Sequence, residues 1–161
     1  MITDRVDAIT KIEERYLKAI CPAPPSVKIE LTARCDLKCS FCASHHNLRK
    51  RGDIDFTLLE KILLDLMNSG VEEIGLFYLG ESLLYPRLLD AICLAKDIGF
   101  RYVFLTTNGR LLNEDRAQMI IDAGLDSIKF SFNAGSKEQY KEITGLDDFD
   151  KVVQNIKTAY R

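Results

Sequence analysis

The sequence lacks any run of about 18 apolar residues, the length that a transmembrane helix needs. Its first residues, Met1-Ile2-Thr3-Asp4-Arg5, lack the apolar core of a secretion signal. Net charge is also nearly absent, because 22 basic residues oppose 24 acidic ones and leave a formal charge of −2. Such a chain has no overall field to attract nucleic acid or an anionic membrane. We therefore expect a cytoplasmic protein with no membrane partner and no nucleic-acid partner.

The sequence has five cysteines, an odd number that cannot all pair in disulfides within one chain. Three of them, Cys35, Cys39 and Cys42, follow one another closely, and disulfides between them would be strained and would be reduced in the cytosol. A cysteine group of this kind in a cytosolic protein indicates a metal site. Cys21 and Cys93 fit no ligand spacing and are interpreted as ordinary thiols.

A repeating pattern dominates the rest of the chain. Three times, a glycine that can end a helix precedes an apolar, β-branched run, at residues 70, 99 and 124. With an earlier apolar run, this pattern predicts four strands, at 27–31, 74–79, 102–107 and 127–133. Strands that alternate with helices form parallel sheets through right-handed crossovers. We therefore predict an α/β fold with a partial (β/α) barrel of parallel strands.

The predicted helices have recognisable starts. Thr57 and Ser136 each begin a capping-box pattern, and Asn113 can cap the helix that follows it. Apolar residues recur at helical spacing over 58–67, and an amphipathic helix is expected over 4–20.

The cysteines follow the first predicted strand with the spacing C-x3-C-x2-C. Parallel sheets place their binding sites at the carboxyl ends of strands. A tight loop of this kind can bring three thiolates round one small inorganic group. An iron–sulfur cubane usually takes four cysteines, so three would leave one iron open to a substrate or cofactor.

Other interpretations of the cysteines remain open on spacing alone. His45 or His46 could complete a zinc site with two of them. The thiols could also pack together by chance. A nucleophilic cysteine is less favoured, because nothing distinguishes one of the three.

Four segments, in order along the chain, resemble motifs of the radical S-adenosylmethionine (radical SAM) superfamily. They are the cysteine loop at 35–42, YLGESLLYP at 78–86 (similar to "GGEP"), LTTNGRLL at 105–112 (similar to "TNG") and FSFNAGSKEQY at 130–140 (similar to "SxD/N" with a "SKExY" helix). The similarity extends from about residue 27 to the end, and it is greatest to members with a SPASM or twitch extension.

The resemblance implies a radical SAM enzyme with a 4Fe–4S cluster on Cys35, Cys39 and Cys42. S-adenosylmethionine would chelate the open iron through its amino and carboxylate groups. Reductive cleavage would then yield a 5′-deoxyadenosyl radical that abstracts hydrogen from an unidentified substrate, either a peptide or protein side chain or a sugar- or nucleoside-like molecule. A reductant such as flavodoxin or ferredoxin would supply the electron. The alternatives are a non-catalytic zinc-binding module and an iron–sulfur electron-transfer module.

The resemblance also implies cofactor contacts, while it assigns no catalytic residue. The methionine ammonium would meet Gly80 and Glu81, since a carboxylate and strand-end carbonyls accept hydrogen bonds from a cation, and glycine allows close approach. Ser131 and Asn133 share one strand face and would contact the carboxylate or ribose. Phe41 would lie against the adenine. The full set of expected cofactor contacts is Phe41, Gly80, Glu81, Ser82, Asn108, Ser131 and Asn133.

Two residues depart from the family pattern. Ser82 stands where relatives usually have proline, so the turn is less rigid unless the serine hydroxyl makes a hydrogen bond. Thr144 stands where many relatives have arginine, which puts a carboxylate clamp at that position in doubt.

We expect an N-terminal helix and linker over residues 1–26 and a radical SAM core over 27–161. Four strand–helix units are present of the six that the family core usually has. The last predicted helix begins at Phe149 and runs to Arg161 with no glycine cap and no following strand. We therefore expect these residues to belong to a longer protein, or to be covered by another chain.

Overall fold

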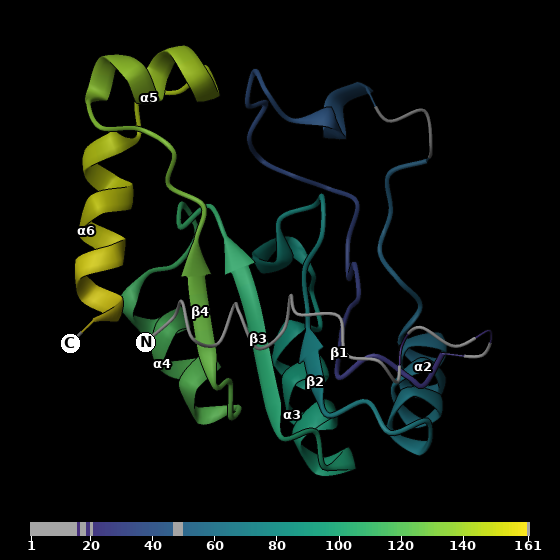
Figure 1. Cartoon of the computed structure of the whole chain (residues 1–161). Helices are drawn as coiled ribbons and strands as arrows, with labels where there is room; N and C mark the ends of the chain where they lie inside the picture. The colour runs from purple at the N-terminus through teal and green to yellow at the C-terminus, as the bar shows by residue number, and fades with distance from the viewer. Residues whose placement is uncertain (1–15, 17–18, 20, 47–49, 161) are drawn as a thin grey trace.

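Four parallel strands form the sheet of the described residues, in the order β1-β2-β3-β4 (Figure 1). The computed structural model describes residues 16, 19, 21–46 and 50–160. The strands are β1 (Ser26–Lys28), β2 (Glu73–Gly75), β3 (Tyr102–Thr107) and β4 (Ser127–Phe130). Every neighbouring pair is parallel. The predicted α/β architecture and the order of its strands are therefore confirmed.

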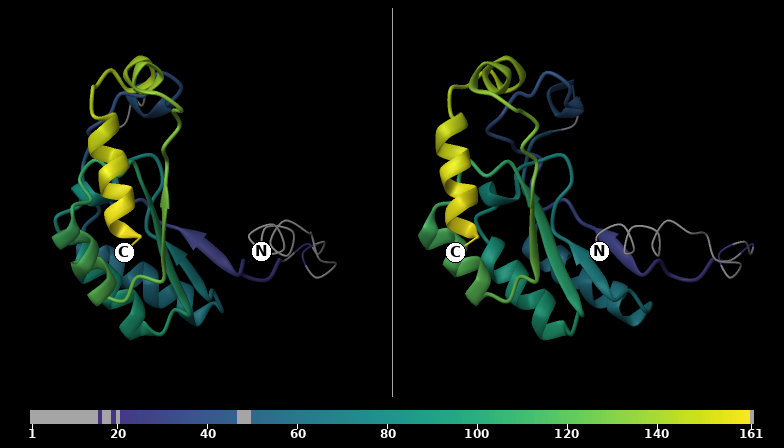
Figure 2. Two further views of the ribbon diagram at one scale, coloured as in Figure 1. Left: turned by 90° about the vertical axis from the view of Figure 1, so that its left-hand side faces the viewer. Right: turned by 60° about the vertical axis from the view of Figure 1, so that its left-hand side comes forward.

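The helices divide into two groups. One face of the sheet is covered by α2 (Phe56–Asn68), α3 (Leu88–Ile98), α4 (Glu114–Asp122) and α6 (Phe149–Ala159), as Figure 2 shows. Beyond the carboxyl ends of the strands lie α5 (Lys137–Thr144) and the short 3₁₀ helix η2 (Ala43–His46), with the cysteine loop beside them (Figure 1). A second 3₁₀ turn, η3 (Ser82–Leu84), follows β2. The arrangement is that of an incomplete parallel barrel.

The strand limits differ from those predicted, except for β3. After Ile29, whose N–H still donates to Gly75, the chain turns to a different partner. Thr32 forms an antiparallel bridge with Asp53, and this diverts the start of the cysteine loop away from β2. β4 is also shorter than predicted, because β3, its pairing partner, ends at Thr107.

Two of the three predicted helix caps are confirmed. The Asn113 side chain accepts a hydrogen bond from the Arg116 N–H at 3.0 Å, and Ser136 caps α5. The prediction of Thr57 as a cap is wrong, because α2 begins at Phe56 and Asp55 accepts from the Leu58 N–H at 2.9 Å. The helix expected over 4–20 lies outside the described residues, apart from residues 16 and 19.

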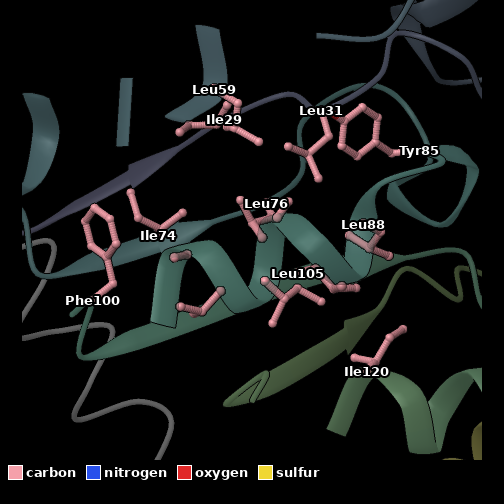
Figure 3. Packing of buried hydrophobic residues seen from close by; sticks show 14 of the residues in the cluster. Ile29, Leu31, Leu59, Ile74, Leu76, Tyr85, Leu88, Phe100, Leu105 and Ile120 are labelled. Carbon is pink, nitrogen blue, oxygen red and sulfur yellow. The ribbon is translucent and has the colours of Figure 1, made fainter. Parts of the chain in front are cut away.

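The hydrophobic core lies between the sheet and its helices (Figure 3). Alternation along β3 buries Val103, Leu105 and Thr107 on the helix side. Leu59 of α2 and Ile92 of α3 are completely buried against this layer. Within the described residues, no helix is both long enough and apolar enough to cross a membrane. The core fixes the strands whose carboxyl ends carry the motifs.

The opposite face of the sheet carries both polar and aromatic side chains. Ser131 and Asn133 share one side of the fourth predicted strand, together with Lys129. Phe77, just after β2, and Phe104 of β3 make an edge contact at 5.7 Å between ring centroids. The alternation of side chains along one strand does not show which side chains the neighbouring strands place on the same face of the sheet.

Candidate functional site

A cavity of about 240 Å³ opens where the four motifs meet at the carboxyl ends of the strands. The cavity is lined by the thiols of the cysteine loop, and also by the turn after β2, the end of β3, the segment after β4 and helix α5. Every site residue predicted from the sequence lines this cavity except Ser82. Those residues are Cys35, Cys39, Phe41, Cys42, Gly80, Glu81, Asn108, Ser131 and Asn133.

The three loop cysteines form no disulfide and are half-buried. Burial raises the pKa of the Cys35 thiol to about 11 and raises that of Cys39 as well. These thiols therefore keep their protons near neutral pH, which disfavours a nucleophilic role. Metal binding would have to displace the protons. Cys42 has a local donor, since the Ser44 N–H points to its sulfur at 3.4 Å.

The donor set fits an iron–sulfur cluster. Thiolates are soft ligands that select zinc or iron–sulfur clusters. Among the described residues, no three Cys, His, Asp or Glu side chains converge on the position of a single metal ion. A cubane takes one cysteine per iron, so its ligands surround a larger body. The side chains of His45 and His46 lie outside the described part, and the zinc alternative therefore stays untested.

Gly80 joins the turn after β2 to the cysteine loop. A Cβ atom on Gly80 would lie 1.8 Å from the carbonyl oxygen of Thr32 and 2.9 Å from that of Arg34. The next residue continues the contact, because the Glu81 N–H donates to the Arg34 oxygen at 2.8 Å. We expected glycine here to admit a ligand. The structure gives a different reason for glycine at this position. The space that a side chain would need is occupied by the backbone that leads into the cysteines.

The sequence analysis missed Glu30, which supports the same turn from the end of β1. Its Oε1 accepts hydrogen bonds from the Leu79 N–H at 3.1 Å and from the Gly80 N–H at 3.3 Å. No motif includes this residue. Glu30 lies within the strand predicted at 27–31, and a carboxylate inside that apolar run was the only available signal.

Glu81 holds the end of β3 against this turn. Its carboxylate is 3% exposed and accepts three hydrogen bonds, from the Thr107 hydroxyl at 2.7 Å, the Asn108 N–H at 2.8 Å and the Leu83 N–H at 3.1 Å. Burial raises the pKa of Glu81, and the three hydrogen bonds partly oppose that rise. A carboxylate has about four acceptor positions, so one remains for a ligand in the cavity wall.

The two departures from the family pattern both have structural explanations. The Ser82 hydroxyl is buried and donates to the Leu76 carbonyl at 2.7 Å, which confirms the expected hydrogen bond in place of proline. This hydroxyl does not face the cavity. Thr144 does line the cavity, where its hydroxyl donates to the Tyr140 carbonyl at 2.8 Å and accepts from the Leu146 N–H at 3.2 Å. Thr144 therefore does not supply the positive charge that an arginine at this position would carry.

The remaining predicted contacts lie toward the mouth of the cavity. Phe41 is 63% exposed, although it is a large apolar ring. Asn133 is exposed, as is Ser131, whose N–H donates to the Thr107 carbonyl at 2.8 Å. Exposed polar and aromatic groups round a cavity can bind a ligand that has both kinds of surface.

Tyr140 of α5 was not predicted as a site residue. It is 3% exposed and lines the cavity, yet its hydroxyl oxygen is buried and has no hydrogen-bond partner among the described residues. Burial raises the pKa of Tyr140 to about 12. At neutral pH this hydroxyl therefore keeps its proton and remains a buried donor.

A charged network, also missed by the sequence analysis, ties the cysteine loop to two distant segments. The Arg110 Nη1 lies 2.6 Å from Asp36 Oδ2, and its Nε lies 2.6 Å from Asp148 Oδ2. The Asn108 side chain donates to the other Asp36 oxygen at 2.8 Å. Burial opposes the Arg110 charge, but hydrogen bonds to the two aspartates outweigh it and raise its pKa. The network holds Asp36, which directly follows Cys35.

We expect Arg110→Ala to lower the free energy of unfolding of the cluster-free protein by about 2 kcal/mol, because it leaves two partly buried carboxylates without their cation. Urea denaturation measures this change. Lys141→Ala is the control, since the Lys141–Asp147 pair is 64% and 70% exposed on its two sides and should contribute little. Equal effects from the two variants would contradict a structural role for the network.

Comparisons with known proteins agree with this geometry. The family model described as the radical SAM superfamily matches residues 29–161. An uncharacterized protein of Methanocaldococcus jannaschii is 40% identical over 81% of this chain. A protein of Saccharolobus islandicus named probable GTP 3′,8-cyclase is 39% identical over 83% of this chain. The chain spans 42% of the length of each of these curated relatives.

Solved structures share the fold. Streptococcus suis SuiB bound to its precursor peptide SuiA matches 87% of this chain and 31% of that chain, with a TM-score of 0.73 and 21% identity. The protein anSMEcpe, with bound AdoMet and a peptide, matches 84% of this chain over 39% of its own length, with a TM-score of 0.68 and 24% identity. Given the family match over most of its length, this chain belongs to the radical SAM superfamily, whose cofactors are a 4Fe–4S cluster and S-adenosylmethionine.

Proposed function

We propose that this chain forms the cofactor-binding part of a radical SAM enzyme, with the cluster on Cys35, Cys39 and Cys42. The observation that supports this most is the shared cavity, which brings the three thiols together with the turn after β2, the end of β3 and the segment after β4. When bound, the two cofactors supply reductive cleavage of S-adenosylmethionine and abstraction of a hydrogen atom from a substrate. The protein contributes ligation, orientation and exclusion of water.

The residues round the cavity divide the binding of S-adenosylmethionine between them. The free acceptor position of Glu81 and the carbonyls of the preceding turn suit the methionine ammonium, as a charge-assisted hydrogen bond to a buried carboxylate. The polar side chains of Ser131 and Asn133 suit the carboxylate or the ribose. Phe41, an exposed ring at the mouth, suits the adenine. Asn108 acts indirectly, since its contacts orient Glu81 and Asp36.

For the electron donor and the substrate, we propose a chemical class. A small reductant protein such as flavodoxin or ferredoxin would reduce the cluster. One curated relative of this chain is a probable GTP 3′,8-cyclase of Saccharolobus islandicus, so GTP is the first substrate to test. Peptides come second, because the peptide-bound neighbours share only the fold.

The test of this function is the response of the reconstituted cluster to S-adenosylmethionine. We expect anaerobic reconstitution to give a brown protein with iron and sulfide, and S-adenosylmethionine to change its electron paramagnetic resonance spectrum. Glu81→Gln should require about tenfold to a hundredfold more S-adenosylmethionine for the same change, because the charge-assisted bond is lost.

The control variant is Glu72→Gln, whose carboxylate lies just before β2 and is mostly exposed beside Arg101. It should titrate like the parent protein. A colourless protein that binds zinc would favour the zinc-module alternative. A cluster whose spectrum stays unchanged at saturating S-adenosylmethionine would favour an electron-transfer module.

A further inference from the structure

Glu30 holds two consecutive peptide groups of the turn after β2. One oxygen of its carboxylate accepts hydrogen bonds from the Leu79 N–H at 3.1 Å and from the Gly80 N–H at 3.3 Å. Two N–H groups that converge on one charged oxygen limit the rotation of both peptide planes. The half-buried Glu30 does not line the cavity, whereas Tyr78, Leu79 and Gly80 do. The carboxylate therefore holds this stretch of the cavity wall from outside the cavity.

The same peptide planes determine where the carbonyl groups of the turn point. In a planar trans peptide, the C=O of one residue and the N–H of the next point in opposite directions. The peptide bonds of this turn are trans. Because the N–H groups of Leu79 and Gly80 point to Glu30, the C=O groups of Tyr78 and Leu79 point away from it. Among the residues that the structure describes, no N–H or O–H donates to either carbonyl oxygen.

These two carbonyls suit a ligand group that only donates hydrogen bonds. They belong to cavity-lining residues just before Glu81, whose carboxylate has one acceptor position left. The amino group of S-adenosylmethionine supplies N–H donors and needs acceptors of this kind. Glycine at position 80 leaves the backbone beside the second peptide group weakly restricted, so a side chain is needed to hold its orientation. Glu30 supplies that side chain.

We infer that Glu30 is a positioning residue for S-adenosylmethionine, which binds the N–H groups of Leu79 and Gly80 and so presents the Tyr78 and Leu79 carbonyls to the amino group of the cofactor. This inference rests on the proposed function. Glu30 contacts no reacting atom. Its contribution is preorganisation, because the carbonyls then face the ligand before it binds and no ordering of the turn opposes binding.

The test compares Glu30→Met and Glu30→Gln with the parent protein after anaerobic reconstitution, at equal iron and sulfide content. Methionine keeps the length of the side chain and removes the acceptor, whereas glutamine keeps an oxygen that both N–H groups can reach. Titration with S-adenosylmethionine, followed by electron paramagnetic resonance, gives the concentration at half of the spectral change. We expect this concentration to rise about fivefold to twentyfold in Glu30→Met and only about twofold to threefold in Glu30→Gln.

The matched control removes another carboxylate that holds a backbone N–H. Asp126, just before β4, accepts from the Val103 N–H of β3 at 2.7 Å and does not line the cavity. It also pairs with Lys96 at 2.8 Å. Asp126→Leu should therefore lower the urea midpoint of the cluster-free protein at least as much as Glu30→Met does. It should nevertheless titrate with S-adenosylmethionine like the parent, which separates positioning from general stability.

A second measurement uses the cluster-free parent protein and needs no variant. Hydrogen exchange of single backbone amides, followed by nuclear magnetic resonance, reports whether the Leu79 and Gly80 N–H groups are hydrogen-bonded in solution. We expect both amides to exchange at least about tenfold more slowly than the same residues in an unfolded chain.

The outcomes separate the inference from the function on which it rests. An unchanged titration in Glu30→Met overturns the inference alone, and so does a Glu30→Gln titration as weak as that of Glu30→Met, because the charge and not the paired hydrogen bonds would then matter. Equal weakening in Asp126→Leu overturns it as well. Unprotected Leu79 and Gly80 amides in the parent overturn it whether or not the variants fold. A parent protein whose cluster does not respond to S-adenosylmethionine overturns the proposed function and the inference together.

Discussion

Gly80→Ala should prevent the cysteine loop from docking on the sheet. The added methyl group would lie 1.8 Å from the Thr32 carbonyl oxygen, and the obstructing atoms are backbone, which cannot move aside as a side chain can. The loop and the turn must then separate, which also breaks the bond from the Glu81 N–H to Arg34. We expect the free energy of unfolding to fall by about 3 kcal/mol or more. Urea denaturation of the cluster-free protein measures this loss, and iron content after reconstitution should fall with it.

Gly52→Ala provides the comparison for this variant. Gly52 also contacts the start of the cysteine loop, since its carbonyl accepts from the Ala33 N–H at 2.9 Å. A methyl group there meets no atom within 4 Å, and the backbone of Gly52 is not in the left-handed region. This variant should fold and bind iron like the parent. If Gly80→Ala behaved in the same way, the proposed packing of the turn on the loop would be wrong.

Replacement of any one of Cys35, Cys39 or Cys42 by alanine should abolish stable iron–sulfur binding. Each ligand is expected to hold a different iron of one cubane, so the loss of one leaves an iron without a protein ligand. Iron and sulfide analysis after anaerobic reconstitution measures the effect. The cluster-free variants should unfold at nearly the parental urea concentration, because these thiols are only half-buried and close no disulfide.

Matched controls come from the other thiols and from the histidines. Cys21→Ala and Cys93→Ala remove exposed cysteines outside the cavity and should keep full iron content. His45→Ala and His46→Ala should also keep it. Full iron content in Cys39→Ala would contradict the ligand assignment, and loss of bound metal in a histidine variant would support the zinc alternative.

Local sequence signals were sufficient where one segment determines its own structure. The helix-ending glycines and the apolar runs after them located three strands, and an earlier apolar run located the first. Asn113 and Ser136 are caps as predicted. The cap of α2 was different, because the sequence pattern indicated Thr57 and the structure has Asp55. Both residues can cap a helix, and the bridge from Thr32 to Asp53 constrains the chain just before Asp55. That bridge joins positions far apart in the sequence.

The amino-acid sequence by itself determined the fold class, the three cysteine ligands as candidates and the set of motifs that line the cavity, because these depend on residue spacing within short segments. Only the tertiary structure revealed why Gly80 must be glycine and that Arg110 joins Asp36 to Asp148. It also showed that the Tyr140 hydroxyl has no hydrogen-bond partner within the described part of the chain. Each of these features is a contact, or a missing contact, between segments that the parallel strand order brings together. Such contacts depend on the packed positions of several elements, which local propensity and spacing do not encode.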